Sequence, residues 1–400
     1  MQEHQSAHSP LAAPPSGVLR RAFLKTGAAA AAGVGLGLGV ASPAYARTTT
    51  RPGIQPFGPV TITDSQGASY ARGLRLSEAL PGQSGTTRTT LATYQQFAFG
   101  KPGGFQIYRS DDDGRTWAPW GTVGAGAGRV WLQPFLYELP RPFAGLPQGA
   151  ILAAGNSLDF SSTKIVLYAS TDHGKTFTYL STVAVGGAPN PTNGFTPVWE
   201  PFLLLNHDRL VCYYSDQRDP LYGQKLAHQT STDLVTWGPV VNDAVGDAYA
   251  NRPGMTTIAR IAHHKWIMTY EYGVSDTYYP VRYKIASDPE EFGDAPSIAL
   301  VDQDGYAPSS APYVSWADFG GPDGTIIVSA NSDADFFLNK AGGDPGAWTR
   351  LSTPMPRSYS RFSAPIESPG SLRRTGSVLV ISGAPYGASA PIQAGVIQLP

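Results

Sequence analysis

The sequence is poor in cysteine, in charged residues and in long apolar runs. Its one cysteine, Cys212, excludes a disulfide within the chain and any cysteine-based zinc site. Charged residues make up only 15% of the chain, and 29 Lys and Arg are balanced by 30 Asp and Glu. This balance argues against nucleic acid as a partner. No histidine pair has metal-ligand spacing and no glycine-rich loop opens a helix, so we expect neither a metal nor a cofactor.

Turn-forming and apolar residues are abundant instead. The chain contains 45 Gly and 35 Pro among 400 residues, which is unfavourable for a coiled coil or a helical bundle. Hydrophobic residues still make up 42% of the sequence and aromatic residues 11%. This is enough apolar material for a core, so disorder is excluded for most of the chain. The length fits either two average domains or one large all-β domain.

The N-terminal segment has the features of an export signal. Arg20-Arg21 precedes a weakly apolar run of Ala and Gly at 27–41, and Ala44-Tyr45-Ala46 follows as a small-x-small cleavage signal. We therefore predict a twin-arginine signal peptide at 1–46, a linker at 47–57 and a secreted protein. A tail with a chance arginine pair is the alternative. The apolar run is too short and too rich in glycine to make a good membrane span.

A turn motif of the form S-x-D-x-G-x-T-[W/F] occurs at 110–117 and again at 170–177, each time after a short alternating strand. Ser and Asp side chains can hydrogen-bond the amides of a turn, and the glycine supplies a positive φ, so the motif predicts a hairpin turn. Its aspartates, Asp112 and Asp172, are expected to hold turns rather than to catalyse. More degenerate copies follow at intervals of about 60 residues.

A second series repeats with the same period. Six short strands carry a proline, or in the first case a glycine, at matched places, and a second apolar strand follows each of them. The residues before these places are Arg72, Gln133, Glu200, Arg252, Ala311 and Ala364. A period near 60 residues with four short strands per unit predicts an all-β, six-bladed β-propeller at 58–400, as a single domain. The strand 59–63 has no blade of its own, so we expect it to complete the sixth blade and close the ring.

Two glutamates stand out on the strands expected to line the central channel. Trp199-Glu200-Pro201 and Tyr270-Glu271-Tyr272 each place a carboxyl group among aromatic residues, where desolvation should raise the pKa of at least one of them. Two carboxyl groups that face each other are the minimum set for glycoside hydrolysis, and neighbouring aromatic rings can stack on sugar faces. The alternative is that one or both glutamates only pair with an arginine, such as Arg72, Arg252 or Arg218.

A polar loop follows the second strand of the third unit, at 213–220. It contains Asp216 and Arg218, and it could hold substrate hydroxyls or form a turn network. The sequence does not separate these two interpretations.

Several long motifs of the chain resemble glycoside hydrolase family 93. They lie at 152–157, 196–205, 212–220, 223–234, 251–257 and 269–273. The family consists of exo-acting α-1,5-L-arabinanases on a six-bladed, sialidase-like propeller with Asp-box (BNR) repeats. Its members release arabinobiose with retention of configuration, using two glutamates. The resemblance places these two catalytic residues on Glu200 and Glu271, the same pair that the repeats indicate.

The resemblance also implies an arabinan substrate and a set of sugar-binding residues. The candidates are Arg72, Asn156, Trp199, Asp216, Arg218, Arg252 and Tyr270. Retention implies two carboxyl groups roughly 5–5.5 Å apart, one of which is the nucleophile. As a working order we take Glu271 as the nucleophile, because flanking tyrosines could hold its charge, and Glu200 as the acid/base. The sequence leaves the reverse order open. We expect a monomer.

Three alternatives remain at this point. An exo-sialidase would use a tyrosine nucleophile and three arginines around one pocket, and Tyr70-Ala71-Arg72-Gly73 stands where its arginine motif would be. A five-bladed arabinanase or arabinofuranosidase conflicts with six repeats. A sugar-binding propeller without catalysis would have several equivalent sites between blades rather than one axial pair of glutamates.

Overall fold

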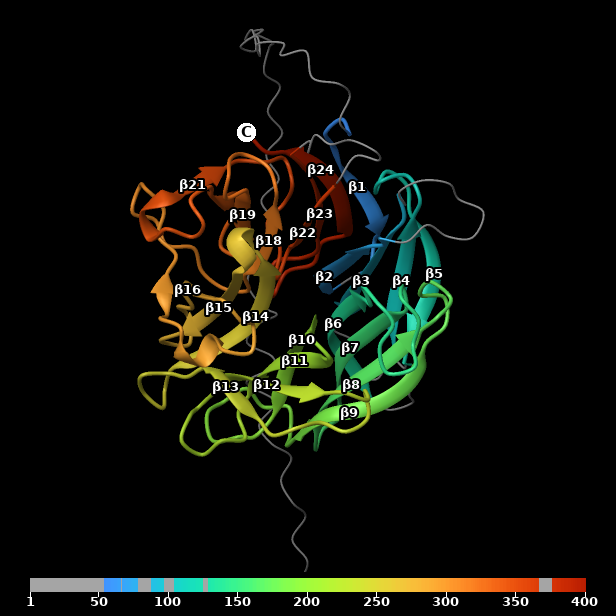
Figure 1. The fold of residues 1–400 in the computed structure, drawn as a ribbon, viewed down its shortest axis with the longest axis vertical. Helices are drawn as coiled ribbons and strands as arrows, with labels where there is room; N and C mark the ends of the chain where they lie inside the picture. The colour runs from blue at the N-terminus through green and yellow to red at the C-terminus, as the bar shows by residue number, and fades with distance from the viewer. Residues whose placement is uncertain (1–53, 66, 78–87, 97–103, 125–128, 367–375) are drawn as a thin grey trace, which may run out of the picture. The chain divides into compact units, whose positions relative to one another are not determined.

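The computed structural model describes residues 54–400 except 66, 78–87, 97–103, 125–128 and 367–375. The predicted signal peptide and most of the predicted linker lie outside the described residues. The described part forms six four-stranded sheets around a central axis (Figure 1). This confirms the predicted six-bladed propeller and argues against the five-bladed alternative. No helix in this part of the chain is long and apolar enough to cross a membrane.

The strands follow the chain blade by blade, with the first strand of each blade nearest the axis (Figure 1). Blade 1 contains β2 (Ala68–Arg75), β3 (Thr90–Gln96), β4 (Phe105–Ser110) and β5 (Ala118–Val123), and blade 2 contains β6 (Val130–Glu138), β7 (Ile151–Leu158), β8 (Thr163–Ser170) and β9 (Thr178–Gly186). Blade 3 contains β10 (Val198–Asn206), β11 (Arg209–Asp216), β12 (Lys225–Ser231) and β13 (Val241–Ala244), and blade 4 contains β14 (Arg252–Arg260), β15 (Trp266–Gly273), β16 (Val281–Ala286) and β17 (Ile298–Ala299). Blade 5 contains β18 (Tyr313–Ala317), β19 (Thr325–Ser329), β20 (Phe336–Asn339) and β21 (Trp348–Leu351). Blade 6 contains β22 (Phe362–Pro365), β23 (Ser377–Ser382), β24 (Ile392–Gln398) and β1 (Phe57–Thr63), and the short 3-10 helices are η1 (Ala262–His264), η2 (Phe292–Asp294) and η3 (Pro345–Ala347).

The ring closes through the N-terminal strand. β1 pairs with β24 as the outermost strand of blade 6, with Phe57 opposite Val396 and Val60 opposite Ala394. The prediction for 59–63 is thereby confirmed. Closure covers a sheet edge that would otherwise be exposed.

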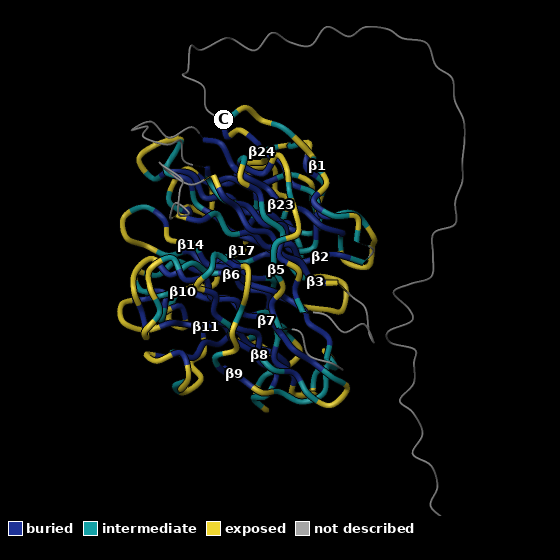
Figure 2. The backbone as a smooth tube through the Cα atoms, turned by 90° about the vertical axis from the view of Figure 1, so that its right-hand side faces the viewer, coloured by how far each residue is buried: buried dark blue, intermediate teal, exposed yellow. Residues whose placement is uncertain are grey.

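The core lies between the blades. Figure 2 shows buried residues along the strands and exposed residues on the loops at their ends. Between blades 2 and 3, the rings of Phe135 and Phe202 lie 4.3 Å apart, and Leu203, Cys212 and Tyr213 are fully buried in the same cluster. Alternating residues of each strand therefore fill the spaces on both faces of a blade, as the apolar runs of the strands require.

Each Asp box forms a tight turn as predicted. Asp172 accepts hydrogen bonds from Thr176 Oγ1 (2.6 Å), Thr176 N (2.9 Å) and Lys175 N (3.1 Å), and Asp112 makes the equivalent set in blade 1. The turn follows Ser170, which pairs with Ile151 at the start of β7. The boxes therefore lie at the end of the blades where the innermost strands finish.

A left-handed residue recurs near the start of every innermost strand. These residues are Tyr70 (φ 52°), Gln133 (φ 58°), Glu200 (φ 62°), Met255 (φ 55°), Ala311 (φ 49°) and Ser360 (φ 57°). In β2, β6, β10 and β14 it lies within a shift of the pairing register, which marks a β-bulge. Non-glycine residues rarely adopt this conformation, so a sixfold recurrence marks a built feature of the fold.

This feature corrects the alignment of the repeats. The sequence series matched Gln133, Glu200 and Ala311 correctly, because a proline follows each left-handed residue there. In blades 1, 4 and 6 it chose Arg72, Arg252 and Ala364, but the equivalent residues are Tyr70, Met255 and Ser360. The bulge, and not the proline or glycine, defines the position.

Candidate active site

Glu200 is the left-handed residue of β10, and its carboxylate is held from two neighbouring elements. Oε2 accepts hydrogen bonds from Ser215 Oγ on β11 (2.6 Å) and from the backbone N–H of Met255 on β14 (2.8 Å). The Gln133 Nε2 group from β6 lies 3.4 Å from Oε1. The side chain is half-buried, so one part of it remains accessible.

Glu271 lies on β15 and has fewer donors. Its Oε2 accepts the backbone N–H of Ala311, the left-handed residue of blade 5, at 2.8 Å. A hydrogen bond from the Ser310 side chain adds to this. Glu271 is also half-buried.

The two carboxyl groups interact and titrate differently. Burial and the nearby charge of Glu200 together raise the pKa of Glu271 to about 7. Burial also raises the pKa of Glu200, but the Ser215 hydroxyl, the Met255 N–H and the positive charges of Arg252 and Arg72 oppose this effect. Of the two, Glu271 is therefore the carboxyl group that keeps its proton to higher pH.

The N–H groups of the left-handed residues connect the site around the ring. Four of these N–H groups each donate a hydrogen bond to a side-chain oxygen of the preceding blade. The pairs are Gln133 N to Gln95 Oε1 (3.0 Å), Glu200 N to Gln133 Oε1 (3.0 Å), Met255 N to Glu200 Oε2 (2.8 Å) and Ala311 N to Glu271 Oε2 (2.8 Å). Blades 1 and 2 supply a neutral glutamine for this purpose, and blades 3 and 4 supply a glutamate.

Arg252 is the centre of a polar network beside Glu200. Its guanidinium donates to Asn193 Oδ1 (2.5 Å), Gln217 Oε1 (3.1 Å) and Gln224 Oε1 (2.6 Å). The Tyr249 carbonyl accepts from Asn193 Nδ2 and from Gly223 N. Three connecting loops, at 187–197, 217–224 and 245–251, are thereby fastened together.

Arg72 lies deeper and separately. Its guanidinium carbon lies 4.1 Å from the centre of the Tyr70 ring and 5.0 Å from that of Tyr313, and Nη1 donates to the carbonyls of Ala71 and Ser360. The side chain is buried, so its charge acts on the site electrostatically. Arg72 and Arg252 have different partners, and the arginine cluster expected of a sialidase does not form around these two.

Two of the other predicted residues support the Glu200 region. Asn156 is fully buried and its Nδ2 donates to the Val198 carbonyl (2.9 Å) and to Gln133 Oε1 (3.3 Å). Trp199 is half-buried and its indole N–H donates to Gln217 Oε1 (2.9 Å), which connects it to the Arg252 network. In this structure the Asn156 amide holds the strand of Glu200 and does not face the open side.

The remaining three predicted residues have other positions. Asp216 and Arg218 pair with each other, and Arg218 also donates to the Tyr214 hydroxyl (2.8 Å), so the polar loop forms the turn network that was one of its two interpretations. Tyr270 is buried in the core between blades and its hydroxyl bonds Ser297. It does not line the site, because neighbouring residues of a strand point to opposite faces and Glu271 takes the other face.

Sequence reasoning missed several residues of the site. Gln133 stood at a matched position of the repeats and Ser215 directly precedes the predicted Asp216, so the signal that could have found them was present. Ser310 comes from a connecting segment between strands, as do Tyr279 and Tyr359, whose pKa values are raised by burial and by the charge of Glu271. These segments differ from blade to blade and carry no periodic pattern.

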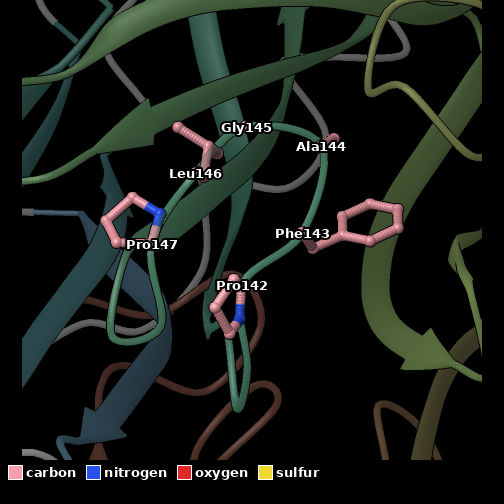
Figure 3. A pocket seen from close by; sticks show the side chains of 6 residues that line it. All are labelled: Pro142, Phe143, Ala144, Gly145, Leu146 and Pro147. Atoms are coloured by element: carbon pink, nitrogen blue, oxygen red, sulfur yellow. The ribbon is translucent and has the colours of Figure 1, made fainter.

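The opposite end of the molecule offers a less suitable site. A depression of about 460 Å³ lies over the loop 142–147 that joins β6 to β7 (Figure 3). Its six lining residues are Pro142, Phe143, Ala144, Gly145, Leu146 and Pro147, which carry no titratable side chain. Within the described residues no group of three or more His, Cys, Asp or Glu could hold a metal ion.

A six-bladed propeller with two interacting carboxyl groups at one end of its blades is the arrangement of a glycoside hydrolase. Similar solved structures identify the family of glycoside hydrolases. The α-L-arabinofuranosidase Arb93A of Fusarium graminearum, solved with an iminosugar inhibitor and as a GH93 enzyme with arabinobiose, is 36% identical over 86% of this chain and 98% of its own, with a TM-score of 0.78. The α-L-arabinanase of Penicillium chrysogenum, solved with arabinobiose, matches with the same values. The chain belongs to glycoside hydrolase family 93.

More distant similarity concerns the fold alone. The NanB sialidase of Streptococcus pneumoniae is 10% identical over 87% of this chain and 70% of its own, with a TM-score of 0.52. No protein-family model matches the chain, and no curated protein matches it. The sialidase-like character predicted from the sequence is therefore a property of the propeller.

Proposed function

We propose that the protein is a secreted, retaining exo-α-1,5-L-arabinanase that releases arabinobiose from linear arabinan. The family and the arabinobiose complexes of its two relatives support the substrate class. The observation that carries the chemistry is the unequal pair of carboxyl groups. Glu200 has three donors and two nearby arginine charges, whereas Glu271 has a pKa near 7.

We assign Glu200 as the nucleophile and Glu271 as the acid/base, which reverses the working order taken from the sequence. Glu271 gives its proton to the oxygen of the scissile bond while the charged Glu200 attacks the anomeric carbon, and an ester to Glu200 forms. Esterification removes the negative charge beside Glu271 and so lowers its pKa. Glu271 then accepts a proton from the water that hydrolyses the ester, and the anomeric configuration is retained.

The Arg252 network supports exo action. An exo enzyme needs one end of its cleft closed, and the three fastened loops at 187–197, 217–224 and 245–251 stand beside Glu200. We propose that they limit the substrate to two sugars on this side of the scissile bond. Product analysis on linear α-1,5-arabinan tests this, with disaccharide expected as the only early product and a ladder of longer products as the contrary result.

Azide rescue tests the two roles. Glu271→Ala, given azide and an arabinobioside with a good leaving group, should yield the azide of retained configuration, because the sugar passes through the Glu200 ester. Glu200→Ala should yield the inverted azide by direct displacement. The opposite pairing of variants and products would assign the roles the other way round.

A further inference from the structure

A row of three tyrosines leads from the buried Tyr70 to the exposed Tyr386. Tyr359, which precedes β22, lies between Tyr70 of blade 1 and Tyr386 of the β23–β24 connection. The ring centres are 5.9 Å apart for Tyr70 and Tyr359 and 5.1 Å apart for Tyr359 and Tyr386. Exposure rises along the row, from 2% at Tyr70 to 66% at Tyr386, with Tyr359 half-buried. The row therefore ends in an open aromatic ring.

Tyr279, from the β15–β16 connection of blade 4, lies near Glu271 as well. Its ring lies against Gly273, where an added Cβ would meet Cε1 at 2.7 Å, and its carbonyl accepts the N–H of Ser310, the residue whose side chain bonds Glu271. Burial raises the pKa of Tyr279, the charge of Glu271 adds to this effect, and the neighbouring charge of Arg252 opposes it. Tyr279 thus lies between the acid/base carboxyl and the exposed end of the row.

The loop that carries Tyr386 is uncharged. This loop, at 383–391, contains no charged residue, and the neighbouring loop at 274–280 contains only Asp276. The Tyr386 N–H is fastened to Asn331 Oδ1 at 3.3 Å. An open aromatic ring on an uncharged loop suits the apolar face of an uncharged sugar.

We propose that Tyr386, backed by Tyr359 and Tyr279, binds the leaving chain of the substrate next to the scissile bond. This assignment rests on the proposed function. The acid/base carboxyl touches the oxygen of the leaving group, so the surface that continues outward from Glu271 receives the sugars that depart. Tyr386 then determines how strongly the enzyme prefers long chains over small leaving groups.

The test compares two substrates that share the same disaccharide end. Arabinopentaose places three sugars on the leaving side, and methyl α-1,5-arabinobioside places only a methyl group there. Tyr386→Ala should lower kcat/KM for arabinopentaose roughly three- to tenfold, mainly through KM, and change that for the methyl glycoside less than about twofold. Tyr386→Phe keeps the ring and should keep most of the preference.

Phe160→Ala is the matched control. Phe160 is 86% exposed on the β7–β8 turn, at the same end of the blades but in blade 2, and its removal should leave both substrates unaffected. Equal losses on both substrates, no loss on either, or the same loss in the Phe160 variant would overturn the assignment while the proposed function stands. No cleavage of either substrate by the unmodified protein would overturn the proposed function together with this assignment.

Discussion

Removal of the Ser215 hydroxyl should move one limb of the pH–rate profile and leave the other in place. Ser215 Oγ donates to Glu200 Oε2 at 2.6 Å, the shortest of the donors to this carboxylate. The hydrogen bond stabilises the charged form, so it lowers the pKa of Glu200 against the effect of burial. In Ser215→Ala the carboxylate loses this donor and ionises at higher pH.

The magnitude follows from the kind of hydrogen bond. A bond to a charged group contributes about 1.5–3 kcal/mol, and 1.36 kcal/mol corresponds to one pH unit. Because the Met255 N–H remains and water can replace part of the lost bond, we expect the acidic limb of kcat/KM to move upward by about one pH unit. The active window narrows from its acidic side, since the alkaline limb stays near the pKa of Glu271, about 7.

Ser310→Ala is the matched control, since Ser310 donates to the other carboxyl group. Its hydrogen bond lowers the pKa of Glu271, so its loss should move the alkaline limb upward and widen the window. The assay is kcat/KM on arabinotriose between about pH 3 and 9, with the limbs fitted as properties of the coupled pair. If Ser215→Ala moved the alkaline limb, or Ser310→Ala the acidic one, the assignment of the lower pKa to Glu200 would be wrong.

Three further substitutions separate stability from catalysis. The pKa of Glu271 is about 7 in the folded protein and ordinarily 4.5, so the folded state keeps this proton to higher pH than the unfolded state does. As the pH rises from 4.5 to 7, the unmodified protein should therefore lose about 3 kcal/mol of stability relative to Glu271→Gln. Urea unfolding of both proteins at pH 4 and 8 measures this change, and a stability difference that is the same at both pH values would contradict it. Asp172→Ala should cost about 1–3 kcal/mol by loss of the turn bonds, with kcat unchanged because the box lies at the far end of the blade; a large loss of kcat at full folding would speak against a purely structural box. Gln133→Ala should lower kcat about tenfold with KM nearly constant, because Gln133 positions Glu200 through its backbone N–H; steady-state kinetics beside Tm decides whether the effect is only one of stability.

The propeller could be predicted from the sequence because its signals repeat. The Asp boxes at 110–117 and 170–177 and the strands after them recur with one period, and turn chemistry gives each box the same local structure. Ring closure by 59–63 followed from counting strands, since one strand was left over. These inferences needed only local chemistry and the number of units.

The repeat alignment of the innermost strands was wrong in the blades where no proline follows the left-handed residue. A proline follows the left-handed residue in blades 2 and 3, at Gln133 and Glu200, but blades 1, 4 and 6 have the same backbone conformation without it at Tyr70, Met255 and Ser360. A backbone conformation shared by Gln, Glu, Tyr, Met, Ala and Ser has no residue signature. Both glutamates were still found, because each is flanked by aromatic residues and Glu200 also has the proline.

The surroundings of the pair required the structure. Tyr270 and Arg252 were predicted as site residues on the same grounds, because each stands close to a glutamate of the pair in the sequence or matches one in the repeats. Strand alternation places Tyr270 in the core, whereas Arg252 reaches Asn193, Gln217 and Gln224 on two other loops. Contacts between loops of different blades depend on the ring geometry, and local sequence carries no information about them.

The ring of bulges explains how a catalytic pair can be part of the fold. Four N–H groups of left-handed residues each need an acceptor from the blade before, because a buried N–H without one would cost about 1–3 kcal/mol. Gln95 and Gln133 meet this need with neutral amides. Glu200 and Glu271 meet it with the same number of atoms and a titratable group, and each keeps a second oxygen or lone pair for chemistry. The structural requirement thus brings the two carboxyl groups into fixed positions at neighbouring blades, and the difference between them comes from what else each one binds.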